Sequence, residues 1–204
     1  MENKILLIGG KFTAKLVIEI LDSDFEVIIF DQKLQKKWFQ GDYTLVNDLK
    51  KINKNKISQY FICIGDNFLR KQYANKLNKT SLKTINIISE DSEIKNLKKV
   101  GRGNLIYGNV YFDYFTSIGN YNYINCSSSI LHDTKIGNYN FISPNVTING
   151  NVRIGNNVFI GSSAVIGPGI TICDNVIIGA NSFVKESIKK KGFYVGSPVL
   201  LKDR

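Results

Sequence analysis

The sequence predicts two structural units, a small α/β domain with a parallel sheet followed by an all-β solenoid of short stacked strands. Two observations lead to this prediction. Over the first 90 residues, short apolar segments typical of strands alternate with segments that have a helical apolar stripe. From Ile106 to Val184, an aliphatic or aromatic residue recurs at every sixth position without a gap.

The first unit is expected to contain four strands and three helices. The strands are predicted over 4–10, 25–32, 59–66 and 82–89, and the helices over 11–24, 43–52 and 68–77. Strands that are joined through helices pair in parallel, and ligands of such sheets bind at the carboxyl ends of the strands. The residues at those ends are Gly9, Gly10, Asp31, Gly65 and Asp66. A tight strand-to-helix turn is the alternative explanation for the glycines, because a full G-x-G-x-x-G fingerprint is absent.

The second unit has a six-residue period, which neither a helix nor a single strand produces. Twelve of the fourteen periodic positions are isoleucine. Three six-residue sides close one coil of about 18 residues, and the periodic side chains point inward and stack about 4.8 Å apart. Glycine and asparagine near the corners are expected to supply backbone angles that other residues resist. The periodicity therefore predicts a β-solenoid.

The net charge of +10 raises the question of a nucleic-acid partner. Within residues 104–184, however, Lys135 and Arg153 are outnumbered by Asp113, Asp133 and Asp174. The excess lysines are spread over the first hundred residues and the C-terminal tail, and no motif of interleaved aromatics and base-reading side chains accompanies them. We therefore expect no nucleic-acid partner. A solvated surface explains the charge, and attraction of an anionic nucleotide or coenzyme is the alternative.

The numbers and spacing of cysteine and histidine limit the metal sites and disulfides that the chain could form. The three cysteines, Cys63, Cys126 and Cys173, are widely spaced, and the chain has one histidine. No zinc-binding spacing is present, so no metal is expected, and a reduced cytoplasmic protein is the simplest inference. No apolar run approaches about 20 residues, and the N-terminus lacks the features of a secretory signal, so no membrane span is predicted.

The single histidine, His132, is the candidate general base. It lies two residues after the inward-pointing Ile130, so its side chain should project outward near a corner. Imidazole titrates near neutrality and can take a proton from an attacking amine or hydroxyl during acyl transfer. The neighbouring Asp133 could orient and strengthen that base, and a backbone N–H of a coil could stabilise the oxyanion. An exposed histidine without a function is the alternative.

Five segments resemble the sugar O- and N-acetyltransferases of the sialic acid and bacillosamine biosynthesis type, which are hexapeptide-repeat enzymes. They are "IGGKFT" (8–13), "FDQ" (30–32), "IGDNFLR" (64–70), "LHDTKIG" (131–137) and "VGSPV" (195–199). The resemblance implies a Rossmann-like N-terminal domain, a left-handed parallel β-helix, a homotrimer and acetyl-CoA as co-substrate. The expected layout is a nucleotide-sugar-binding domain over 1–90, a connector over 91–103, the β-helix over 104–186 and a tail over 187–204.

The same resemblance implies roles for individual residues. His132 would be the general base and Asp133 its acidic neighbour. The sequence departs from many family members at Phe141, where they have a second histidine, and at the first turn, where larger residues replace small ones. Acetyl-CoA would contact Phe141, Ser162 and Ala180, and the sugar nucleotide would contact Gly9, Gly10, Lys11, Phe12, Thr13, Asp31, Gly65 and Asp66.

The expected function is transfer of an acetyl group from acetyl-CoA to the amine of a nucleotide-linked amino sugar. O-Acetylation of sialic acid or a related sugar is one alternative, and a non-catalytic nucleotide-sensing β-solenoid that serves assembly is another. The sequence does not name the sugar or the position that is acetylated.

Overall fold

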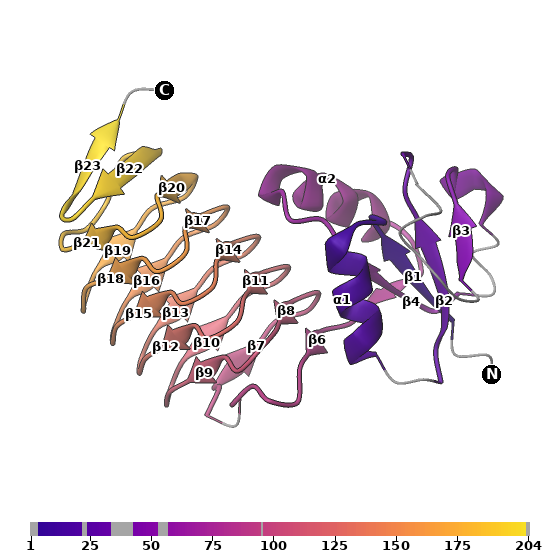
Figure 1. The fold of residues 1–204 in the computed structure, drawn as a ribbon, viewed down its shortest axis with the longest axis horizontal. Coiled ribbons are helices and arrows are strands. Elements are labelled where there is room, and N and C mark those ends of the chain that lie inside the picture. The colour runs from indigo at the N-terminus through magenta and orange to yellow at the C-terminus, as the bar shows by residue number, and fades with distance from the viewer. Residues whose placement is uncertain (1–3, 22–23, 34–42, 53–56, 95, 203–204) are drawn as a thin grey trace. The chain divides into compact units, whose positions relative to one another are not determined.

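The structure is a computed structural model, which describes residues 4–21, 24–33, 43–52, 57–94 and 96–202. The chain divides into two units, Met1–Ile87 and Ile88–Arg204 (Figure 1). The helix expected over 11–24 includes residues 22–23, which lie outside the described residues. No helix in the described residues is long and apolar enough to cross a membrane.

The first unit is built on a five-stranded parallel sheet with the order β3-β2-β1-β4-β5. Because the chain leaves the central strand β1 first to one side and later to the other, the carboxyl ends of β1 and β4 flank a topological switch point. The elements are β1 (Lys4–Ile8), α1 (Phe12–Ile20), β2 (Glu26–Phe30), β3 (Thr44–Val46), the 3-10 helix η2 (Leu49–Lys51), β4 (Gln59–Ile62), α2 (Asn67–Leu77) and β5 (Lys83–Thr84).

Burial on both faces explains why the central strand, β1, is a continuous apolar run in the sequence. Residues Ile5 to Ile8 of β1 are at most 1% exposed, so both faces of the strand are covered. On α1, the buried side chains are Ala14, Leu16 and Val17, which follow a helical spacing. The alternation of strands and helices that the sequence predicts is therefore confirmed for the core of this unit.

Two expected elements differ from the structure. The helix expected over 43–52 is wrong: β3 pairs with β2 through Ile28 and Thr44, and η2 follows it. The short η2 begins where the Asp48 side chain accepts a hydrogen bond from the Lys50 N–H, an alternative to helix that aspartate offers. The single strand expected over 82–89 is two strands, β5 in the first sheet and β6 (Ile87–Ile88), which pairs with β8 of the solenoid.

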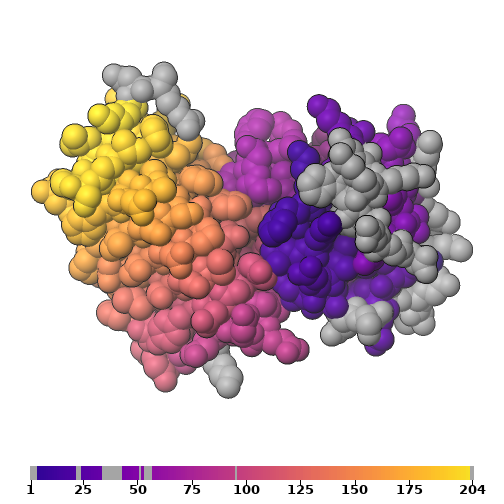
Figure 2. Space-filling view, in the orientation of Figure 1, coloured from indigo at the N-terminus to yellow at the C-terminus, as the bar shows by residue number. Residues whose placement is uncertain are grey.

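The second unit is a β-solenoid whose strands stack into three sheets, or sides. Residues 18 positions apart pair in parallel, as Ile118 does with Ile136 and Ile136 with Ile154, which confirms the predicted coil length. In Figure 2 the coils form one continuous surface that changes colour from magenta to yellow. The first side contains β7 (Lys99–Val100), β10 (Ser117–Ile118), β13 (Lys135–Ile136), β16 (Arg153–Ile154) and β19 (Thr171–Ile172).

The other two sides complete each coil. The second side contains β6, β8 (Leu105–Ile106), β11 (Tyr123–Ile124), β14 (Phe141–Ile142), β17 (Phe159–Ile160), β20 (Val176–Ile178), β22 (Gly192–Gly196) and β23 (Val199–Lys202). The third side contains β9 (Tyr111–Phe112), β12 (Ser129–Ile130), β15 (Thr147–Ile148), β18 (Val165–Ile166) and β21 (Phe183–Val184).

The core of the solenoid consists of the side chains that the six-residue period selects. All fourteen periodic residues from Ile106 to Val184 are at most 4% exposed and belong to one apolar cluster. The stacked strands begin before the six-residue period begins. Strand β7 lies in the segment expected as a connector, and it pairs with β10 of the next coil. At the other end, the expected tail contributes β22, which pairs in parallel with β20, and β23, which pairs antiparallel with β22.

The corners combine residues with positive φ and glycines that allow successive coils to approach closely. Every sixth residue from Asn109 to Asn181 adopts a positive φ, and Gly169 is the one glycine in this series. Asparagine is among the residues that tolerate this region best. Glycines such as Gly119 and Gly137 do not have positive φ, contrary to the expectation for glycine at corners. A Cβ on Gly119 would lie 2.5 Å from the Gly137 carbonyl oxygen, so these glycines are required by close approach of successive coils. The non-glycine residues with positive φ are Asn109, Phe115, Tyr121, Ser127, Asp133, Tyr139, Asn145, Asn151, Asn157, Ser163, Asn175 and Asn181.

Candidate active site

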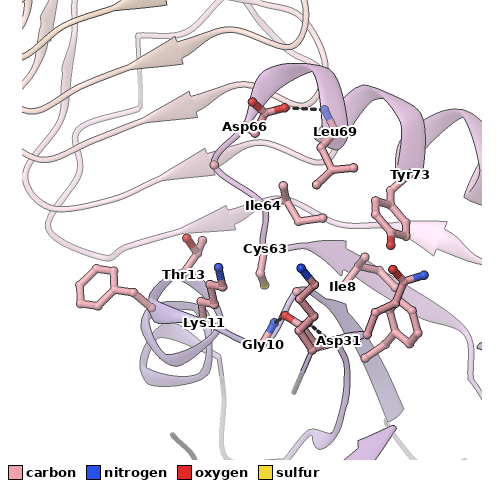
Figure 3. A pocket seen from close by; sticks show the side chains of 16 residues that line it. Ile8, Gly10, Lys11, Thr13, Asp31, Cys63, Ile64, Asp66, Leu69 and Tyr73 are labelled. Carbon is pink, nitrogen blue, oxygen red and sulfur yellow. Dashed lines mark hydrogen bonds between the residues drawn. The ribbon is translucent and has the colours of Figure 1, made fainter. Parts of the chain in front are cut away.

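A cavity of about 500 Å³ lies at the carboxyl ends of β1, β2 and β4 in the first unit (Figure 3). This is the edge at which parallel sheets bind ligands. The structure brings together here all eight residues that the sequence suggests for substrate binding: Gly9, Gly10, Lys11, Phe12, Thr13, Asp31, Gly65 and Asp66.

The first turn of this cavity is held by Asp31. Its Oδ2 accepts a hydrogen bond from the Gly10 N–H at 2.8 Å, and its Oδ1 accepts one from the Lys33 N–H at 2.8 Å. Gly9 has φ +104, and a Cβ there would lie 2.8 Å from the Cys63 carbonyl oxygen. The glycine is therefore required by the turn and by the neighbouring strand, and Asp31 organises the cavity as well as lining it.

The loop from β4 to α2 is organised by two other side chains. Asp66 caps α2, because its Oδ1 accepts a hydrogen bond from the Leu69 N–H at 2.7 Å (Figure 3). Arg70 is fully buried and donates from one nitrogen to the carbonyl oxygens of Ile64 and Gly65, each at 2.9 Å. The guanidinium thereby satisfies carbonyl groups that the loop leaves without strand partners.

Sequence reasoning missed the apolar wall of the cavity. Leu69 and Tyr73 lie four residues apart on α2, so both can face the cavity from one side of the helix. Burial first and the Asp31 charge second raise the pKa of the Tyr73 hydroxyl, which favours the protonated, hydrogen-bond-donating form. Burial also raises the pKa of the Cys63 thiol well above its usual range, so this thiol is not a nucleophile here. The remaining lining residues outside the expected set are Ile8, Phe30, Gln32, Lys33 and Ile64.

In the second unit, His132 lies at the corner between β12 and β13, as the six-residue register predicts. Its Nδ1 lies 3.0 Å from Oδ2 of Asp133, and both side chains are more than half exposed. Asp133 is one of the corner residues with positive φ, at 58°. This backbone angle is held on both sides, because the Asp133 N–H donates to the Tyr114 carbonyl and the Asn151 N–H donates to the His132 carbonyl.

The imidazole of His132 packs on Gly150, which is one coil further along. A Cβ on Gly150 would lie 2.5 Å from Cε1 and 3.0 Å from Cδ2 of His132, with Nε2 also in contact. Within the part of the chain that the structure describes, the Gly150 N–H has no hydrogen-bond acceptor. Gly150 was missed by the sequence reasoning, although its position 18 residues after His132 follows from the coil length.

The three residues expected to contact the coenzyme lie on and beside the second side of the solenoid. Phe141 faces outward from β14, and its ring stacks on that of Phe159 with centroids 5.4 Å apart and planes at 17°. Tyr123 packs on the other side of the Phe141 ring, with centroids 6.0 Å apart. Ser162 and Ala180 occupy the next corner, 18 residues apart, where the Asn181 N–H donates to the Ser162 carbonyl.

One chain does not bring these residues to His132. The corner of Ser162 and Ala180 precedes the third side, whereas the corner of His132 follows it. The full length of a six-residue side therefore separates the expected coenzyme contacts from the expected base. No group of three or more histidine, cysteine, aspartate or glutamate side chains that could hold a metal ion occurs among the described residues.

Comparison with protein families identifies both units. Residues 115–150 and 151–186 match the bacterial transferase hexapeptide family (six repeats), and residues 4–77 match the PglD N-terminal domain. The chain is a hexapeptide-repeat acetyltransferase with a PglD-type N-terminal domain. The sequence of this hexapeptide acetyltransferase has no significant match among curated proteins.

Solved structures show the same two-unit fold. The acetyltransferase domain of PglB from Neisseria gonorrhoeae FA1090 is 19% identical, with a TM-score of 0.89 over 98% of this chain and 100% of that one. PerB from Caulobacter crescentus, solved with CoA and GDP-perosamine, is 25% identical, with a TM-score of 0.87 over 98% and 97%. WeeI from Acinetobacter baumannii AYE is 23% identical, with a TM-score of 0.82 over 97% and 99%. The hexapeptide acetyltransferase thus has the left-handed β-helix that the sequence resemblance implies.

Proposed function

We propose that this acetyltransferase transfers the acetyl group of acetyl-CoA to the amine of a nucleotide-linked amino sugar, with His132 as general base. The observation that carries the proposal is the corner geometry, in which Asp133 contacts Nδ1 and the other edge of the ring lies against the Gly150 backbone. The amine is favoured over a hydroxyl as acceptor because PerB, which resembles this chain over its whole length, is solved with an amino-sugar nucleotide and CoA.

The corner supplies each proton-transfer step of direct acetyl transfer. With Nδ1 protonated and donating to Asp133, Nε2 has a free lone pair. The acceptor nitrogen attacks the thioester carbonyl carbon while Nε2 removes a proton from that nitrogen. The tetrahedral intermediate collapses by breaking the carbon–sulfur bond, and the proton passes from Nε2 to the departing thiolate of CoA. The N–H of Gly150, which has no acceptor among the described residues, is the proposed donor to the oxyanion.

The cavity of the first unit is the proposed site for the nucleotide part of the acceptor. Its apolar wall, formed by Phe30, Leu69 and Tyr73 among others, suits a planar base, and its polar floor carries Asp31 and the start of α1. Its volume of about 500 Å³ is within the usual range for small-molecule sites.

The coenzyme site is proposed to lie between two copies of the chain in a homotrimer. Phe141, Ser162 and Ala180 would contact acetyl-CoA from one subunit, and His132 would act from a neighbour. In one chain Phe141 lies on the second side, and the corner of Ser162 and Ala180 is at the opposite end of the third side from the corner of His132. Light scattering should give a mass near three times 23.0 kDa, and a monomeric mass with full activity would contradict this arrangement. We further propose that the enzyme works in the cytoplasm, where its acetyl donor would be supplied.

His132→Ala tests the assignment. We expect kcat/KM to fall by about 10²-fold or more, with unchanged affinity for CoA and unchanged melting temperature, because the exposed ring makes no core contact. The acceptors to assay are UDP- and GDP-linked amino sugars, with CMP-sialic acid and free sialic acid as hydroxyl acceptors, by release of the CoA thiol. A near-normal rate in the variant, or preference for the hydroxyl acceptors, would overturn the corresponding part of the proposal.

A further inference from the structure

Three exposed basic residues lie in a line along one side of the solenoid. Lys135 and Arg153 are the two basic residues of 104–184, and the structure places them in register on neighbouring strands, β13 and β16. Lys99 faces outward two coils earlier on the same side, where β7 pairs with β10. We call Lys99, Lys135 and Arg153, with Ser117 between the first two, the basic column.

The basic column is not neutralised by the protein. Like charges on directly paired strands repel one another, and this arrangement is unfavourable unless an opposite charge lies nearby. In the described residues, Lys99, Lys135 and Arg153 have no ion-pair partner, and each is exposed. Lys99 and Lys135 line a groove whose one acidic lining residue, Asp133, already contacts His132. The column therefore has positive charge available for an anion.

A groove connects this charge to the candidate catalytic corner. It has a volume of about 580 Å³ and is lined by Lys98, Lys99, Phe115, Ser117, Asp133 and Lys135. Asp133 and Lys135 are two residues apart, which limits their Cα separation to about 7 Å. From β7 to β16 the column spans three strand spacings, about 14 Å, so it can follow a ligand that carries more than one phosphate.

We propose that the basic column is a phosphate-binding site for one of the two co-substrates of the acetyl transfer. This inference rests on the proposed function, because both co-substrates carry phosphates: the diphosphate of the sugar nucleotide, and the phosphates of the coenzyme. Lysine and arginine bind phosphate through charge-assisted hydrogen bonds, and arginine can do so with two parallel bonds. The column would hold such a group beside the corner at which His132 and Asp133 lie.

The test uses Lys135→Gln, Arg153→Gln and the double variant in the full-length protein. Lys189→Gln is the matched control, because Lys189 is also exposed but lies outside the column. Calorimetric titrations with UDP and GDP represent the sugar nucleotide, and titrations with adenosine 3′,5′-bisphosphate represent the coenzyme. We expect each single variant to weaken binding of one of these two ligand classes by about tenfold, and the class affected identifies the source of the phosphate.

Two further measurements distinguish phosphate binding by the basic column from a general effect of charge, and test it independently of the general-base role of His132. Without ligand, the variants should melt at or above the wild-type temperature, since a repulsion is removed. His132→Ala should lose turnover but bind all three ligands normally, so the two proposals can fail separately. Unchanged affinity for every ligand in the double variant, or equal weakening in Lys189→Gln, would overturn the phosphate site.

Discussion

The ring of His132 occupies the space that a Cβ at Gly150, one coil away, would need, so a single methyl group at position 150 would overlap the imidazole. The two residues are 18 positions apart, which is one turn of the solenoid. The absence of a side chain at position 150 is therefore a condition for the observed position of the proposed base.

Gly150→Ala should impair catalysis more than folding. The added Cβ would displace the exposed end of a flexible side chain, and a misplacement of about 1 Å can cost about 10²-fold in rate. The comparison variant is Gly137→Ala, whose Cβ would lie 2.5 Å from the Gly155 carbonyl oxygen, part of the backbone. Gly137→Ala should lower the free energy of unfolding by about 1–3 kcal/mol. Thermal melts and kcat/KM measure both, and a Gly150→Ala enzyme with normal rate would contradict the assigned ring position.

Asp133→Asn isolates the charge of the carboxylate. Asparagine occupies six of the twelve non-glycine corners with positive φ, so the backbone at position 133 should be retained. The amide oxygen can still accept from Nδ1, but it stabilises a charged imidazole less, so kcat/KM should fall by about tenfold with little change in KM. Steady-state kinetics at saturating acetyl-CoA measure this. If the variant keeps the wild-type rate, Asp133 has only a structural role at the corner.

Asp31 should control nucleotide affinity through the turn that it holds. Asp31→Ala leaves the N–H groups of Gly10 and Lys33 without their acceptor, so the turn should loosen and nucleotide affinity should fall by about tenfold. Asp31→Asn keeps one acceptor and should have an intermediate effect. Asp48→Ala is the control, because Asp48 also accepts from a backbone N–H but does not line the cavity. Calorimetry with UDP and GDP distinguishes the three variants, and equal affinities would remove Asp31 from the site.

Phe141 should affect the coenzyme rather than the chemistry. In Phe141→Ala the stacking on Phe159 is lost, which should cost about 0.5–1.5 kcal/mol of stability, and the KM for acetyl-CoA should rise with kcat nearly unchanged. Phe141→His keeps a planar ring and should retain more of the affinity. Tyr111→Ala, on the third side, removes an exposed aromatic that lies outside the proposed coenzyme contacts. A change in kcat alone for Phe141→Ala would contradict this role.

The order of amino acids was sufficient to predict the solenoid, its inward-facing residues and the corner position of His132. This prediction was possible because the six-residue period is a local pattern. Once each periodic Ile is assigned to the interior, every position between two of them has a defined place in the coil. The ends of the strands in the first unit were also predictable, since Gly9, Asp31 and Gly65 follow apolar runs directly. The same local reasoning misassigned 43–52, where pairing of β3 with β2 overrides the apparent helical pattern.

Contacts between residues far apart in the chain could be found only in the folded molecule. The bond from the Gly10 N–H to Asp31 joins positions 21 apart, and the register of Lys135 with Arg153 depends on the whole coil between them. The packing of His132 on Gly150 occurs at a corner where Asp133 has positive φ and where hydrogen bonds join the neighbouring coils. Periodicity assigns each residue to a face, whereas the free energy of close packing between coils decides which atoms meet there.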